Sequence, residues 1–140
     1  MSRIFWDTNL FIYVLEGEEP NHSRAVNLRK AMSSRGDRLL TSTLTLGEVL
    51  VKPLEKGNAA LYGKYEEMIN TAAVVVPFDQ KEARIYARLR SDRSIKAPDA
   101  MQLACAAAAG VDLFITNDER LHGKQVEGIQ FIVPLERAPL

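Results

Sequence analysis

The sequence has few of the residues that build disulfide frameworks or zinc sites. Its 140 residues include one cysteine, Cys105, and two histidines, His22 and His122. A single cysteine excludes an internal disulfide and cannot form a zinc site alone. Because the histidines lie far from it and from each other in the sequence, binding of a soft metal is not expected.

The chain also has no excess of charge and no long apolar run. Lysine plus arginine total 18, as do aspartate plus glutamate, so no global field attracts the chain to nucleic acid or membrane. Contact with a polyanion must come from a local patch or from bound cations. The longest uncharged run, residues 100–111, is shorter than the ~20 apolar residues that span a bilayer. No signal peptide is recognisable either, so we expect a cytoplasmic protein without membrane contact.

The sequence alternates short apolar segments with helical patterns and has no internal repeat or linker. We expect one domain over residues 1–140. The predicted strands are residues 3–6, 38–42, 73–77, 112–116 and 129–133, and the predicted helices are residues 8–15, 22–33, 45–56, 59–70, 80–90 and 98–109. Asp79 to Glu82 has the form of a capping box at the start of one helix. This alternation predicts an α/β fold with three layers, α/β/α, in which helices cover both faces of a parallel sheet.

Four acidic residues follow or flank the predicted strands. Asp7 directly follows the first strand, and Asp118 follows the strand at 112–116. Glu48 lies early in the helix after the second strand, and Asp99 lies in the first turn of the helix that begins at residue 98. Ligands of parallel sheets gather beyond the carboxyl ends of the strands. The four acids could therefore converge on one edge.

Each acid also has a purely structural explanation. Asp7 could cap the following helix, and Glu48 closes a segment from Thr45 that has the form of a capping box. Asp99 could stabilise its helix through the N-terminal dipole, and Asp118 could be a turn residue. The functional interpretation therefore depends on all four acids lying at the sheet edge together.

An acidic cluster repels a phosphodiester unless a cation is bound. A bound Mg²⁺ or Mn²⁺ inverts the local field, and carboxylate oxygens are the ligands that such hard ions prefer. The ion can polarise a phosphoryl oxygen and lower the pKa of a bound water. Two carboxylates ~4 Å apart repel by about 4 kcal/mol at an effective dielectric constant near 20. Convergence therefore predicts a bound cation.

The segments that contain the acids resemble the PIN-domain nucleases, and most closely the small VapC-type toxins of toxin–antitoxin pairs. The matching segments are residues 7–9, 43–49, 97–100 and 115–118, and the resemblance covers nearly the whole chain. It implies a sheet of about five parallel strands in the order 3-2-1-4-5, with helices on both sides. It also implies a Mg²⁺- or Mn²⁺-dependent endoribonuclease.

The resemblance further implies roles for individual residues. Asp7, Asp99 and Asp118 would hold the metal directly or through water, and Glu48 would complete the catalytic set and orient the attacking water. The supporting polar residues would be Thr8, Asn9, Thr116 and Asn117. Proteins of this type are usually homodimers held by a small antitoxin that occludes the active site, and an arginine of such a partner could pair with the acids.

Basic residues precede the helix that carries Asp99. Arg93 and Lys96 could contact RNA phosphates near the metal, or they could belong to a solvated surface.

Two other functions compete with the ribonuclease interpretation. A metal-dependent phosphatase of the aspartyl-phosphate type also places an aspartate after its first strand, but it usually has a second acid two residues on, where this chain has Asn9. A non-catalytic α/β binding module, in which the acids are only caps, is the other alternative.

Overall fold

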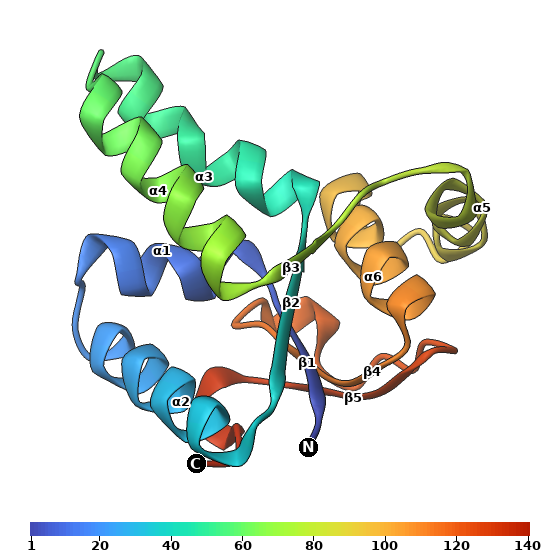
Figure 1. Cartoon of the computed structure of the whole chain (residues 1–140). Coiled ribbons are helices and arrows are strands. Elements are labelled where there is room, and N and C mark those ends of the chain that lie inside the picture. Colours follow the sequence, from blue (N-terminus) through green and yellow to red (C-terminus); the bar gives the residue numbers. More distant parts are fainter.

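A parallel sheet of five strands forms the centre of the computed structural model, which describes residues 1–140 (Figure 1). The strands are β1 (Arg3–Trp6), β2 (Arg38–Ser42), β3 (Val74–Val76), β4 (Val111–Ile115) and β5 (Ile129–Val133). They lie in the order β3-β2-β1-β4-β5, and every neighbouring pair is parallel. The predicted parallel sheet and its strand order are confirmed.

Helices cover both faces of the sheet. They are α1 (Thr8–Glu16), α2 (Asn21–Arg35), α3 (Thr43–Glu55), α4 (Ala59–Ala72), α5 (Gln80–Leu89) and α6 (Ala97–Ala109), with short 3₁₀ helices η1 (Glu119–Leu121) and η2 (Leu135–Arg137). Helices α1 to α4 pack on one face, whereas α5 and α6 pack on the other (Figure 1). The three-layer arrangement is therefore confirmed. None of the helices combines the length and the apolar character that a membrane span requires.

The central strand β1 contributes to both hydrophobic cores. Ile4 and Trp6 pack with α1 to α4, whereas Phe5 points to the opposite face. There its ring stacks on Phe114 of β4 with centroids 5.1 Å apart. Burial on both faces explains why Ile4, Phe5 and Trp6 are all apolar, without the alternation of a strand that is buried on one face only. Cys105 is also buried in the second core, as expected for a small hydrophobic residue.

Side-chain caps set the starts of two helices. The Asp79–Glu82 capping box of α5 is confirmed. Helix α3 begins at Thr43, two residues earlier than predicted, because the Ser42 hydroxyl accepts a hydrogen bond from the backbone N–H of Thr45 at 3.3 Å. The alternative in which Glu48 closes a capping box with Thr45 is therefore wrong, since α3 is capped by another residue.

Candidate active site

The register of the sheet brings the ends of β1 and β4 together. Trp6 lies opposite Ile115, and the backbone N–H of Asp7 donates to the Ile115 carbonyl at 3.0 Å. Asp7 and Asp118 therefore leave the sheet at the same edge. Helix α3 starts directly after β2, at that same carboxyl edge, because all five strands are parallel.

Asp7 is the most buried acid of this edge. Its residue is 8 % exposed. Its Oδ1 accepts from the backbone N–H of Thr8 at 2.8 Å, and its Oδ2 accepts from the Thr116 hydroxyl at 2.7 Å. Burial raises the pKa of Asp7, and the negative charges of Glu48 and Asp118 raise it further. The two hydrogen bonds lower this pKa but do not cancel the shift. Asp7 is also the N-cap of α1, so capping and membership of an acidic site coexist in one residue.

Asp99 and Asp118 form a coupled pair beside Asp7. Burial, and then the negative charges of Asp118 and Asp7, raise the pKa of Asp99 to about 6. The pKa of Asp118 is lowered, chiefly because the Arg120 guanidinium donates to both of its carboxylate oxygens, at 2.9 and 2.7 Å. The Nη2 atom of Arg120 also lies 3.5 Å from Oδ2 of Asp99. Three acids from distant parts of the chain thus share one electrostatic environment.

Glu48 lies at the exposed rim of the site on α3. The Thr8 hydroxyl donates to Oε1 of Glu48 at 2.7 Å, and the charge of Glu48 contributes to the raised pKa of Asp7. The structure therefore places all four predicted acids around one edge. Their catalytic and metal-binding roles stay predictions.

A buried glutamine that the sequence interpretation missed connects these residues. Gln102 of α6 is 2 % exposed. Its Nε2 lies 2.7 Å from Thr45 Oγ1, 3.0 Å from Thr8 Oγ1 and 3.3 Å from Asp7 Oδ1. Its Oε1 accepts from the Ser42 hydroxyl. The available signal was a polar residue in an alanine-rich helix, three positions after the acid of its first turn and hence on the same face.

The predicted supporting residues differ in their contacts. Thr8 and Thr116 hydrogen-bond to the acids. The Oδ1 atom of Asn9 is buried without a hydrogen-bond partner. Asn117 donates to the Tyr13 hydroxyl at 3.2 Å and accepts from the backbone N–H of Leu135 at 3.0 Å. Asn117 therefore fastens the C-terminal segment to α1, and its hydrogen bonds do not orient the acids.

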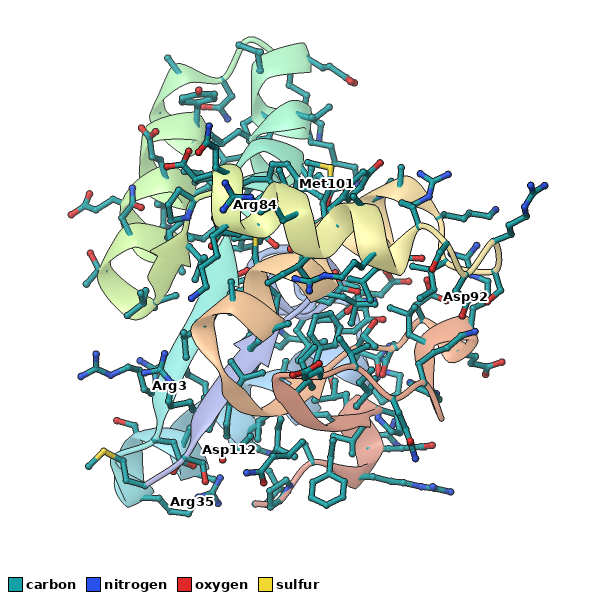
Figure 2. All side chains as sticks on the ribbon, turned by 90° about the vertical axis from the view of Figure 1, so that its right-hand side faces the viewer. Arg3, Arg35, Arg84, Asp92, Met101 and Asp112 are labelled. Atoms are coloured by element: carbon teal, nitrogen blue, oxygen red, sulfur yellow. The ribbon has the colours of Figure 1, made fainter.

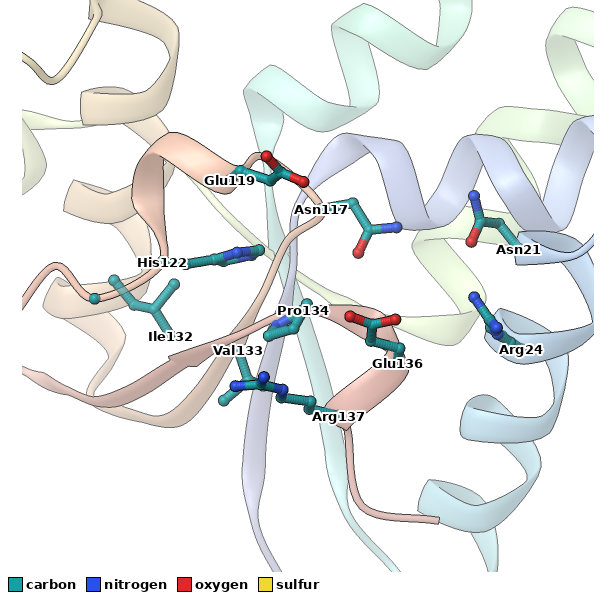
Figure 3. Close-up of a pocket in the computed structure, with 11 residues that line it drawn as sticks. Asn21, Arg24, Asn117, Glu119, His122, Ile132, Val133, Pro134, Glu136 and Arg137 are labelled. Atoms are coloured by element: carbon teal, nitrogen blue, oxygen red, sulfur yellow. The ribbon is translucent and has the colours of Figure 1, made fainter.

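A polar pocket of about 550 Å³ is lined by residues of α2, the segment after β4 and the C-terminal segment, and by none of the four acids (Figure 3). Asn117 and Glu119, the two neighbours of Asp118 in the sequence, line one side of the pocket, and Arg24 and Arg137 line another. The two arginines are exposed.

The acidic edge suits a hard cation by its donor chemistry. All four acids offer carboxylate oxygens, which Mg²⁺ and Mn²⁺ prefer. Burial and neighbouring negative charges raise the pKa values of Asp7 and Asp99, and a bound cation would oppose both effects. A cationic group, Arg120, already contacts two of the four acids. As the side chains stand, however, no three histidine, cysteine or acidic residues form a ready cluster of metal ligands. Coordination therefore requires side-chain movement.

Comparison with known proteins identifies the family. The sequence profile of the PIN domain matches residues 4–126. The chain belongs to the PIN-domain family. No curated protein sequence matches this PIN domain.

Several solved structures share the fold of this PIN domain. VapBC2 from Rickettsia felis, bound to a DNA fragment from its promoter, is 14% identical with a TM-score of 0.75, over 94% of this chain and 98% of that one. DNA-bound VapBC from Salmonella typhimurium is 18% identical with a TM-score of 0.73, over 96% and 99% of the two chains. VapBC-5 from Mycobacterium tuberculosis, a member of the VapBC family of toxin–antitoxin systems, is 22% identical with a TM-score of 0.62, over 95% and 99%. The PIN fold therefore extends over almost the whole chain.

The raised pKa of Asp99 predicts how stability depends on pH. The pKa of Asp99 is about 6 in the folded protein, against a reference value of 3.8. Between these two pH values, the folded state therefore binds more protons than the unfolded state. The contribution of Asp99 to the free energy of unfolding therefore decreases as the pH rises from 3.8 to about 6 and is constant above.

Thermal melts between pH 4.5 and 7.5 in EDTA measure this effect. Asp99→Asn should remove most of the decrease in Tm. Mn²⁺ should raise the Tm of the parent at pH 7.5 more than at pH 4.5, because protons compete for the same carboxylates. Equal dependence of Tm on pH for the parent and Asp99→Asn would show that Asp99 is not the group with the raised pKa.

Proposed function

We propose that this PIN domain is a Mg²⁺- or Mn²⁺-dependent endoribonuclease that hydrolyses RNA phosphodiester bonds, and that it is the toxin of a toxin–antitoxin pair. Membership of a nuclease family gives the general class of reaction. The observation that carries the proposal is the position of Asp7, Glu48, Asp99 and Asp118 around one edge of the sheet, with raised pKa values for Asp7 and Asp99.

The acids would divide the work according to their surroundings. Asp7, Asp99 and Asp118 would hold the ion, which when bound supplies charge stabilisation at the phosphate and a water of lowered pKa. Hydrogen bonds from Thr116 and the Thr8 backbone fix both oxygens of Asp7, so its orientation is set before substrate binds. Glu48 is exposed and uses only Oε1 in its bond with Thr8, so Oε2 is available to orient the attacking water.

RNA would reach the acids through basic side chains on either side. Arg24 and Arg137 line the pocket that Asn117 and Glu119, the sequence neighbours of Asp118, also line (Figure 3). Arg93 and Lys96 are exposed in the segment that leads into α6. Contacts from such side chains to phosphates supply affinity without reading the base sequence. We propose these four residues as the RNA-binding surface.

The proposed partner is a small antitoxin that occludes the acids, and the proposed assembly is a homodimer bound by it. Support comes from the shared fold with VapBC complexes. The contact of Arg120 with Asp118 and Asp99 supports the mode of inhibition, because it demonstrates that a guanidinium group fits between these carboxylates. An arginine of a partner could bind the site in the same way.

Purified protein, freed of any partner, tests the proposal directly. We would incubate it with structured RNA, with DNA of the same sequence and with a small phosphomonoester, each in Mn²⁺ and in EDTA. The expected result is internal cleavage of RNA in Mn²⁺ alone. Phosphate release from the small ester with intact RNA would favour the phosphatase. No reaction with any substrate would favour the binding module.

A further inference from the structure

Arg120 contacts two acids of the site, through its guanidinium group and its backbone N–H. Its Nε and Nη2 donate to the two carboxylate oxygens of Asp118 at 2.9 and 2.7 Å, and its backbone N–H donates to Oδ1 of Asp118 at 3.1 Å. The same Nη2 lies 3.5 Å from Oδ2 of Asp99. One guanidinium group therefore contacts two acids, Asp118 from the segment after β4 and Asp99 from α6.

This contact is well formed but easily broken. A two-pronged arginine–carboxylate pair has better geometry than most ion pairs. The positive charge of Arg120 also opposes the burial and the negative charges that raise the pKa of Asp99. However, the Arg120 side chain is 53% exposed, so water competes for its guanidinium group. The side chain can therefore turn into solvent without disturbing either hydrophobic core.

We propose that Arg120 is an internal counter-ion of the acidic site, which a divalent ion must displace from Asp118 and Asp99. This inference rests on the proposed function, because it assumes that these acids hold a metal. The guanidinium occupies both oxygens of Asp118, and it would repel a cation placed between the two carboxylates. Displacement also agrees with the side-chain arrangement. The acids do not form a ready cluster of metal ligands while Arg120 binds Asp118.

Displacement predicts two effects of opposite sign for Arg120→Ala. Without metal, the variant should melt at a lower temperature than the parent, because the repulsion among the acids is no longer offset. With metal, it should bind Mn²⁺ more tightly, by about tenfold, since the ion no longer competes with a charged, hydrogen-bonded group. Arg120→Lys, which keeps the charge but loses the two-pronged contact, should bind Mn²⁺ with an intermediate affinity.

The experiment is a calorimetric titration of the full chain with Mn²⁺, together with thermal melts in EDTA. Lys124→Ala is the matched control, because Lys124 lies on the same loop and its Nζ is 3.0 Å from Oδ2 of Asp92, an acid outside the site. Its removal lowers the local positive charge without freeing Asp118. The affinity of this control for Mn²⁺ should equal that of the parent.

Three outcomes would overturn the inference. Arg120→Ala could bind Mn²⁺ no more tightly than the parent, or more weakly, in which case Arg120 only orients Asp118. Lys124→Ala could gain as much affinity for Mn²⁺, in which case the loss of any nearby positive charge would explain the gain. Neither the parent nor Arg120→Ala could bind Mn²⁺ at all. Only this last outcome also removes the metal from the proposed function. The first two leave the proposed function intact, since Mn²⁺-dependent RNA cleavage is measured in a separate experiment.

Discussion

Asp7→Asn should reduce the metal-dependent cleavage of RNA by about 100-fold or more, with the fold unchanged. A metal that acts as a Lewis acid contributes several kcal/mol to phosphoryl transfer, and each 1.36 kcal/mol is a factor of about ten in rate. Asparagine keeps the size of the side chain and caps a helix as well as aspartate does. Because the pKa of Asp7 is raised by burial, loss of its charge should leave the Tm in EDTA equal or higher.

Asp112→Asn is the matched control for this prediction. Asp112 lies near the start of β4, where its Oδ2 accepts from the backbone N–H of Arg3 at 2.8 Å. Figure 2 shows Asp112 and Arg3 at the lower edge of the molecule, near the start of β1. The same change of aspartate to asparagine there should leave the cleavage rate within about twofold of the parent. Asp112 lies toward the amino ends of the strands, away from the acids, and substitutions remote from a site usually have small effects. Equal cleavage by parent, control and Asp7→Asn would indicate a contaminating nuclease.

Gln102→Leu should reduce both stability and activity. Leucine has a similar size, but it leaves the buried Ser42 hydroxyl without its acceptor and removes the amide that donates to the buried hydroxyls of Thr45 and Thr8. Each buried polar group that loses its hydrogen bond costs about 1–3 kcal/mol. We therefore expect the free energy of unfolding to fall by about 2–4 kcal/mol, which lowers the Tm of a domain of this size by roughly 5–15 °C.

The loss of activity in Gln102→Leu has a separate cause. Gln102 holds the hydroxyl of Thr8, which in turn binds Glu48, and it also contacts Asp7. Loss of this amide should therefore lower kcat more than it raises KM, even at a temperature where the variant is fully folded. Gln130→Leu makes the same change on an exposed position of β5 and should alter neither quantity. A Gln102→Leu variant with the kcat of the parent would remove Gln102 from the site.

The fold could be predicted from the sequence because its signals are local and consistent. The apolar runs of β1 and β4 and the helices between them specify a covered parallel sheet. That topology alone places the residues that follow each strand at one edge, so Asp7 and Asp118 could be assigned to the same edge before any coordinates. The distance of Asp99 from these two acids depended on how α6 packs against the sheet, which the local sequence at the start of α6 did not determine.

The contacts that complete the site could not be predicted, because they depend on side-chain packing between distant segments. Gln102 looked like an ordinary helix residue until α6 was placed against α1 and α3. Arg120 followed Asp118 by two positions, a spacing common in turns, and the sequence did not indicate that its guanidinium would reach Asp99 as well. The helix start at Thr43 was misplaced because a serine at the end of a strand can act as a cap.

The central claim is that Asp7, Asp99 and Asp118 bind one hard divalent ion. Anomalous diffraction from crystals of the parent soaked in Mn²⁺ tests it most directly. We expect an anomalous peak about 2.0–2.3 Å from a carboxylate oxygen of at least two of these residues, with Arg120 turned away, and no such peak for Asp7→Asn. A peak elsewhere on the surface, or an empty edge at a Mn²⁺ concentration that supports RNA cleavage, would contradict the assignment.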